Sequence, residues 1–397
     1  MEIASNSPAR STIEIRSSPP MTHPLFSDIP RHIASEIQLP IGGSALDLAL
    51  MPVVPQRLCN MSCCKAVLLE SLAPAREDSE ILDMLNRLPC PSKSLLDSIM
   101  RDKTVEGKFI QSFKVSHSGR STILPLWVLA FWHSVATHWA DIVGWKRAHH
   151  CLINEFECAE VLGLFSTIPW DARCPIPGAT VSDLATFATT EWLTDNHINL
   201  LGWYVNGEIE SKSVRLVQAG YPERIGYLFN AWNTKTAPPD LKYHWLDSLR
   251  QQLRDGTLKK IGFVINTVAG AGLPIPPQVG NHWVAAVIDG ENREMWLGDS
   301  MGKPPHKTVI QMLDWWLRPA FHTRFSVRHL PCHRQQTSWN CGDRSINMIA
   351  HHFDPEQFPL IGNRESDEIQ NRLELFYYIV ERIRLAVRKS PKFLRVM

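Results

Sequence analysis

Three residues in the C-terminal half of the chain have the types and the order needed for nucleophilic catalysis by a thiol. They are His282, Asp299 and Cys341. A cysteine attacks carbonyl carbons as thiolate, so it needs an imidazole nearby and benefits from a helix N-terminus. The imidazole in turn needs a third group that fixes its tautomer and orientation. The pattern therefore predicts a cysteine protease centre in which Cys341 is the nucleophile, His282 the base and Asp299 the orienting group.

The residues between the histidine and the aspartate predict a β-hairpin. Val284–Ile288 is an apolar run of strand length, and Asp289–Asn292 supplies turn residues. Glu294–Leu297 then leads back to the aspartate. Such a hairpin places the ring of His282 beside the carboxylate of Asp299.

A helix is expected to begin directly after the cysteine. Gly342 permits a tight turn into a helix that starts near Asp343. The N-terminus of that helix favours negative charge on the sulfur of Cys341. Asp343 opposes a neighbouring thiolate, and Arg344 is expected to offset it.

These segments resemble the SUMO-specific cysteine protease family of the Ulp/SENP type. The matching segments are His282–Trp283, Asp299–Ser300 and Gln335–Gly342. Upstream, Glu191–Asn199 is similar to the family's Trp-Leu-x-Asp segment, in which a helix begins and a Trp faces the substrate channel. The similarity spans residues 160–390.

The resemblance implies an α+β, papain-like or adenain-like fold, with a small mixed sheet flanked by helices. It implies a cysteine-type peptidase that uses His282, Asp299 and Cys341 and needs no metal or organic cofactor. The reaction implied is cleavage after the C-terminal Gly-Gly of a ubiquitin-like modifier, in SUMO deconjugation or maturation. The implied partners are the ubiquitin-like protein and its conjugates.

By the same resemblance, a glutamine side chain and the backbone N–H of Cys341 hold the oxyanion. Two residues qualify for this role. Counting back from Cys341 selects Gln335, whereas aligning Gln336 and Thr337 with the family's Gln-Thr selects Gln336. The sequence does not decide between Gln335 and Gln336 as the oxyanion donor.

Two tryptophans are expected to line a narrow channel for the Gly-Gly tail. The resemblance assigns Trp283 and Trp192 to it. For each of them, ordinary core packing is the alternative, and it is weighed equally with the channel for Trp192.

Two other functions are compatible with these motifs. One is a binding module, such as one derived from a mobile element, that keeps the groove for a ubiquitin-like protein but has weak or no turnover. The altered residues after Cys341 and Gly342 motivate this alternative, because the family normally runs apolar there. The other is acyl transfer by the same triad, but the Gln and Trp elements favour hydrolysis.

Composition limits the remaining classes of function. Hydrophobic residues make up 44% of the chain and the net charge is +1, so no overall field favours nucleic acid or a membrane surface. Nine cysteines form no paired framework, which indicates a reducing, intracellular compartment, the nucleus or the cytoplasm. Cys59, Cys63 and Cys64 lack a second such cluster or spaced histidines, so no metal site is expected.

Three regions are expected along the chain. Residues 1–40 are rich in Ser and Pro and predict a disordered tail. Residues 45–155 predict a helical accessory region, since apolar residues repeat at helical spacing in Ile81–Leu88 and Trp127–Ile142. Residues 160–397 form the expected protease domain.

Overall fold

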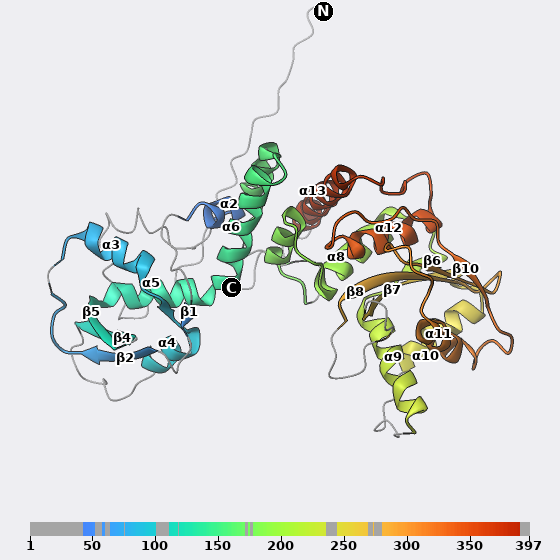
Figure 1. Cartoon of the computed structure of the whole chain (residues 1–397), viewed down its shortest axis with the longest axis horizontal. Helices are drawn as coiled ribbons and strands as arrows, with labels where there is room; N and C mark the ends of the chain where they lie inside the picture. Colours follow the sequence, from blue (N-terminus) through green and yellow to red (C-terminus); the bar gives the residue numbers. More distant parts are fainter. Residues whose placement is uncertain are drawn as a thin grey trace, which may run out of the picture. The chain divides into compact units, whose positions relative to one another are not determined.

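The computed structural model describes residues 43–51, 58–59, 64–74, 76–100, 111–117, 119–170, 174, 178–235, 244–268, 273 and 280–389. The expected disordered tail, most of the glycine- and proline-rich loop before His282, and the end of the basic C-terminal segment lie outside these residues. The chain divides into two compact units (Figure 1). The first covers mainly residues 51–139, and the second covers residues 44–50 and 140–394.

The first unit contains both helices and strands. Its helices are α3 (Asp78–Arg87), α4 (Lys93–Met100) and α5 (Leu126–Thr137), and its strands are β1 (Leu58–Cys59), β2 (Cys64–Leu69), β3 (Cys90–Pro91), β4 (Ser112–His117) and β5 (Arg120–Pro125). Strands β2, β4 and β5 form an antiparallel sheet in that order, against which α4 and α5 pack. The prediction of a helical region was therefore incomplete, because it included the helices and omitted this sheet.

The second unit is built on a five-stranded mixed sheet with the order β10-β9-β8-β7-β6. Its strands are β6 (Val214–Leu216), β7 (Lys260–Thr267), β8 (His282–Asp289), β9 (Glu294–Gly298) and β10 (Ser326–His329). The central strands β7, β8 and β9 are antiparallel, whereas β6 and β10 pair in parallel at the edges. The predicted small mixed sheet flanked by helices is confirmed.

Helices cover both faces of this sheet (Figure 1). On one side lie α8 (Asp195–Glu208), α12 (Cys341–Phe353) and α13 (Glu365–Lys389), and on the other lie α9 (Gly220–Asn233), α10 (His244–Arg254) and α11 (Lys307–Leu317). The remaining helices of this unit are α2 (Ala45–Ala49), α6 (Trp139–Asn154), η3 (Ala159–Val161), α7 (Leu162–Phe165) and η4 (Val181–Ala188). None of the described helices is long and apolar enough to cross a membrane.

The helix α12 approaches the sheet closely because two glycines lie beneath it. A Cβ atom on Gly262 of β7 would lie 2.4 Å from Ile349, and one on Gly298 would lie 2.5 Å from the sulfur of Met348. Both distances are shorter than real Cβ contacts. The glycines therefore fix the depth at which α12, with Cys341 as its first residue, rests on the central strands.

The predicted hairpin is formed by β8 and β9. Its turn is closed by the buried Asp289, whose carboxylate accepts hydrogen bonds from the backbone and the side chain of Asn292 at 2.8 and 3.0 Å. In this register Ala285 pairs with Gly298. The first residue of β8 and the residue that follows β9 therefore come together at the same end of the sheet.

Candidate active site

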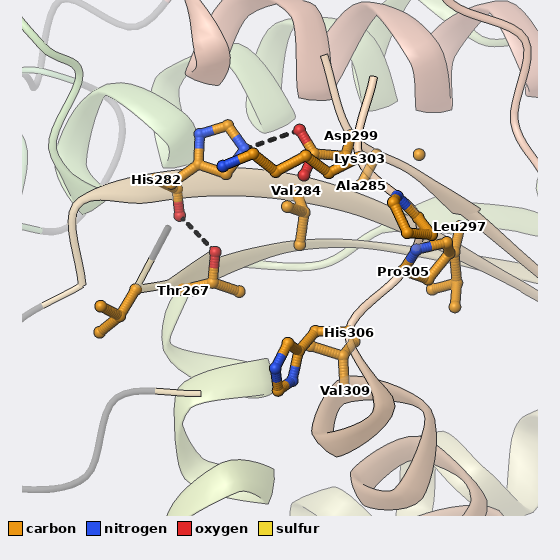
Figure 2. Close-up of a pocket in the computed structure, with 13 residues that line it drawn as sticks. Thr267, His282, Val284, Ala285, Leu297, Asp299, Lys303, Pro305, His306 and Val309 are labelled. Atoms are coloured by element: carbon orange, nitrogen blue, oxygen red, sulfur yellow. Dashed lines mark hydrogen bonds and ion pairs between the residues drawn. The ribbon is translucent and has the colours of Figure 1, made fainter. Parts of the chain in front are cut away.

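His282 and Asp299 form a hydrogen bond at the end of this hairpin. Nε2 of His282 lies 2.8 Å from Oδ1 of Asp299, as Figure 2 shows. The same carboxylate oxygen accepts the backbone N–H of Met301 at 2.8 Å, which fixes its direction. On the other side, Thr267 of β7 donates its hydroxyl to the carbonyl of His282 at 3.1 Å.

The surroundings of His282 favour its charged form. Burial lowers the pKa of the ring, but hydrogen bonds and charge from Asp299 and Cys341 outweigh burial and raise the pKa to about 9. Since Nε2 is engaged by Asp299, the other ring nitrogen remains for the thiol. The arrangement suits a histidine that carries a proton beside a thiolate.

Cys341 is the first residue of α12, and its side chain is buried. This places the sulfur at the positive end of the helix dipole. Gly342 lets the helix start approach α8, since a Cβ there would lie 3.2 Å from Leu193 and from Ile198. The structure thus brings Cys341, His282 and Asp299 together.

The charged residues after Cys341 and Gly342 are engaged in ion pairs inside the protein. Asp343 is fully buried and pairs with Nε of Arg372 on α13 at 2.9 Å. Arg344 is also buried and pairs with Glu368 on α13 at 2.7 Å. Arg344 was expected to offset Asp343; its charge does favour the ionised form of that carboxyl, but Arg372 on the neighbouring helix is the residue that pairs with it.

The two candidate glutamines differ in their surroundings. Gln335 is partly buried, its backbone N–H donates to the carbonyl of Ser300, and its side-chain oxygen accepts the hydroxyl of Ser300 at 2.5 Å. Its amide nitrogen donates to the carbonyl of Thr337 at 2.8 Å. Gln336 is exposed, and its side chain donates to the carbonyl of Arg334. Only Gln335 is thus tied to the residue that follows Asp299.

A cleft of about 640 Å³ lies beside His282. Its lining includes Trp192, Trp283 and His282, and its far side is formed by residues of α9 such as Tyr227. Trp192 is 45% exposed, whereas Trp283 is 4% exposed and donates its indole N–H to the carbonyl of Leu193 at 2.8 Å. Both tryptophans therefore border the cleft, and Trp283 also packs in the core.

A second pocket lies at His282 and Asp299 in the direction of α11 (Figure 2). Apolar side chains such as Val284, Leu297 and Val309 line most of it. Its volume of about 50 Å³ admits only a few water molecules. The larger cleft is thus the one with room for a peptide.

Among the described residues, one group has side chains close enough to share a metal ion. His150, Cys151 and Glu155 have ligand atoms within 4.8 Å of one another, at and just after the C-terminal end of α6. Burial and the hydrogen bond to Glu155 raise the pKa of Cys151 to about 11, so the thiol stays protonated. These three residues are not part of the candidate triad.

Sequence reasoning missed Glu368 and Arg372, which contact the segments around the candidate triad. They are four residues apart on α13. The available signal was a pair of charges at a spacing that puts both on one helix face, matched by the unusual Asp343 and Arg344. That signal does not specify the partners.

The comparisons with known proteins point to one family. Residues 191–380 match the family model described as the Ulp1 protease family, C-terminal catalytic domain. No curated protein matches the chain.

Several solved structures are similar to parts of the chain. The yeast Ulp1 protease domain in complex with Smt3, the yeast ortholog of SUMO, is 16% identical, with 58% of this chain and 96% of that one covered and a TM-score of 0.42. A structure of SUMO protease Ulp1 with its catalytic cysteine oxidised to a sulfenic acid is 18% identical, with 58% and 95% covered and a TM-score of 0.43. The catalytic domain of the Ulp1-like SUMO protease of Chaetomium thermophilum is 19% identical, with 49% and 73% covered and a TM-score of 0.30.

Proposed function

We propose that this protein, whose residues 191–380 match the Ulp1 protease family model, is a cysteine peptidase that cleaves after the C-terminal Gly-Gly of a ubiquitin-like modifier, SUMO in the first place. The observation that carries the proposal is the position of Cys341 at the start of α12, hydrogen-bonded to a histidine that Asp299 orients. Solved structures similar to this chain are of SUMO proteases, one of them bound to the yeast ortholog of SUMO. The nucleus or the cytoplasm is the compartment in which we place this activity.

The reaction follows from the groups present. The thiolate of Cys341 attacks the carbonyl carbon of the terminal glycine, and the electron pair of the carbonyl moves to its oxygen. His282 then donates its proton to the leaving amine as the C–N bond breaks, which leaves a thioester on Cys341. His282 next takes a proton from water, whose oxygen hydrolyses the thioester and frees the thiol.

The side chain of Gln335 and the backbone N–H of Cys341 are proposed to hold the oxyanion. The contacts of Gln335 with Ser300 support this choice over Gln336, because they tie it to the residue that follows Asp299. Donors that are fixed before the reaction stabilise developing charge at no reorganisation cost. Trp192 and Trp283 are proposed to flank the extended Gly-Gly tail in the large cleft.

The binding-module alternative is less well supported. It arose from the charged residues after Cys341 and Gly342, but Asp343 and Arg344 are both paired within the protein. Each of these charges therefore has a buried partner of opposite sign.

Covalent trapping tests the proposal. Ubiquitin-like proteins with a C-terminal electrophile are incubated with the wild type, Cys341→Ala and His282→Ala, and adducts are measured by mass spectrometry. We expect an adduct with SUMO on the wild type, none on Cys341→Ala, and much slower formation on His282→Ala.

Cys332→Ala is the matched control, since this partly buried thiol precedes Cys341 in the same segment. The adduct should form on it as on the wild type. If folded wild-type protein forms no adduct with any modifier, the peptidase proposal fails. An adduct with a different modifier would retain the chemistry and replace SUMO as the substrate.

A further inference from the structure

Two buried ion pairs join the first turn of α12 to α13, and they involve residues that the proposed reaction does not use. Glu368 pairs with Arg344, Arg372 pairs with Asp343, and no more than 3% of any of these four side chains is exposed. Charged side chains are almost never so deeply buried without a partner. Because Glu368 and Arg372 are four residues apart, they lie on the same face of α13.

Glu368 also holds the segment that leads to the nucleophile. One of its carboxylate oxygens accepts the backbone N–H of Gln336 at 2.8 Å. The other accepts the backbone N–H and the hydroxyl of Thr337, at 3.0 and 2.6 Å. Since the side chain of Gln335 donates to the carbonyl of Thr337, the carboxylate fixes the turn that orients Gln335.

Arg372 holds a different part of the site. One nitrogen of its guanidinium group donates to the carbonyls of Thr189 and Glu191, both at 2.8 Å. Its charged group also lies over the ring of Trp339, 4.3 Å from the ring centroid. Arg372 therefore ties the segment just before Trp192 to the turn just before Cys341.

We propose that Glu368 and Arg372 are positioning residues of the proposed protease: Glu368 sets the oxyanion donor Gln335, and Arg372 sets the channel residue Trp192. The inference rests on the proposed function and adds that the two side chains position different parts of the site. Neither residue touches the substrate. Each acts through the backbone segment that it holds.

The proposal predicts that two conservative variants affect different kinetic constants, one mainly kcat and the other mainly KM. Glu368→Gln keeps the shape but replaces an acceptor oxygen with an amide that meets the donors of Thr337. Because a misplaced catalytic group can cost about 100-fold in rate, we expect kcat to fall by about that factor with KM little changed. Arg372→Lys keeps the charge but loses the planar guanidinium group that donates to the carbonyls of Thr189 and Glu191. We expect KM to rise about ten-fold, roughly the effect of one lost hydrogen bond to a charged group, with a smaller change in kcat.

The experiment measures kcat and KM on a SUMO substrate, together with the pH dependence of Cys341 alkylation by iodoacetamide. Alkylation reports the thiol and His282 and does not need the oxyanion donor. In Glu368→Gln we expect the alkylation profile to stay within about two-fold of the wild type while kcat falls, because the contacts of Glu368 are with Gln336, Thr337 and Arg344, whereas alkylation depends on Cys341 and His282. A general loss of structure would lower both together.

Glu374→Gln is the matched control, as it makes the same exchange on the exposed side of α13 and should leave all three quantities unchanged. If Glu368→Gln does not fold, Thr337→Val serves instead, because it removes one hydrogen bond to the same carboxylate and leaves the ion pair with Arg344 intact. We then expect a smaller fall in kcat, again with an unchanged alkylation profile. A folded variant with unchanged kcat, or a parallel loss of kcat and alkylation, overturns the positioning role alone. Absence of turnover and of trapping in the wild type overturns the proposed function and this role with it.

Discussion

His282 is subject to opposing influences, and their balance determines the pH range in which the site works. Burial lowers its pKa, while Asp299 and Cys341 raise it, and the result lies near 9. Because the folded pKa exceeds the unfolded value of about 6.5, the ring's contribution to stability is fully present below that pH. It is lost as the pH rises through about 9.

The pH profile of kcat/KM is therefore expected to fall on the alkaline side near pH 9, where His282 loses its proton. Asp299→Asn should move this fall to lower pH, since it removes one of the two causes of the raised pKa and leaves Cys341 alone to oppose burial. The rate should also fall by about 10³-fold or more, as when a triad aspartate becomes an amide. Steady-state kinetics across the pH range would check both effects. An unshifted alkaline limb in the variant would exclude Asp299 as the partner of His282.

The two glutamines give a second residue-scale prediction. Gln335→Ala is expected to lower kcat by about 10²–10³-fold, the usual cost of one oxyanion donor, with little effect on KM. Gln336→Ala should change kcat by less than about two-fold, since exposed side chains without such contacts have small effects. Equal losses in the two variants, measured on one substrate, would refute the assignment to Gln335.

Residues that are brought together by neighbouring segments of the chain could be predicted from the sequence. Residues that reach the site from a distant segment could not. His282 and Asp299 come together through one hairpin, so their contact follows from the strand pattern between them. Glu368 and Arg372 reach the site only through helix packing, which residue spacing does not encode. The sequence shows that Glu368 and Arg372 are charged, but it does not show which residues they pair with.

At the scale of elements, the two tryptophans of the cleft belong to different parts of the fold and differ in burial. Trp283 belongs to strand β8 and bonds to the carbonyl of Leu193, whereas Trp192 precedes α8 and is half-exposed. Trp283→Ala should therefore lower the free energy of unfolding by about 3–5 kcal/mol, as for other buried aromatic residues. Thermal or chemical unfolding measures this effect.

Trp192→Ala should instead act on binding. We expect a change in stability below about 1 kcal/mol, because the side chain is exposed. KM for the ubiquitin-like substrate should rise by about ten-fold or more, as for an exposed aromatic anchor. A stability loss equal to that of Trp283→Ala, with KM unchanged, would assign Trp192 to the core.

Some elements that pair with their sequence neighbours were predicted, but the neighbouring strands β4 and β5 were not. The hairpin of β8 and β9 and the helix after Cys341 match their patterns. Strand β2 was missed because its only partner in the sheet is β4, more than forty residues later. The predicted apolar repeat from Trp127 to Ile142 is also split, since α5 ends at Thr137 and α6 starts at Trp139.

At the scale of the whole molecule, we expect the protease domain to start earlier than residue 160. The second compact unit begins at Ala140, inside α6, and Trp145 of this helix packs on Phe165 with ring centroids 4.8 Å apart. Phe165 in turn contacts Phe376 of α13 at 5.9 Å. A fragment that starts at 160 would expose these aromatic surfaces.

A fragment 140–397 should accordingly unfold at a higher temperature than a fragment 160–397. In the full chain, Trp145→Ala should cost about 3–5 kcal/mol of stability, since Trp145 is fully buried. Calorimetry of the two fragments and of the variant would check this boundary. Equal melting temperatures for the two fragments would place α6 outside the domain.

The position of Glu368 and Arg372 near the end of the chain has a consequence for biosynthesis. Chains are made from the N-terminus, so His282, Asp299 and Cys341 all leave the ribosome before α13 does. Until α13 docks, Asp343 and Arg344 lack their ion-pair partners, and the turn that follows Gln335 lacks the carboxylate that accepts its backbone N–H groups. A polypeptide that stops before residue 365 thus contains every reacting group but lacks the two side chains that, on our proposal, position the oxyanion donor and the channel residue.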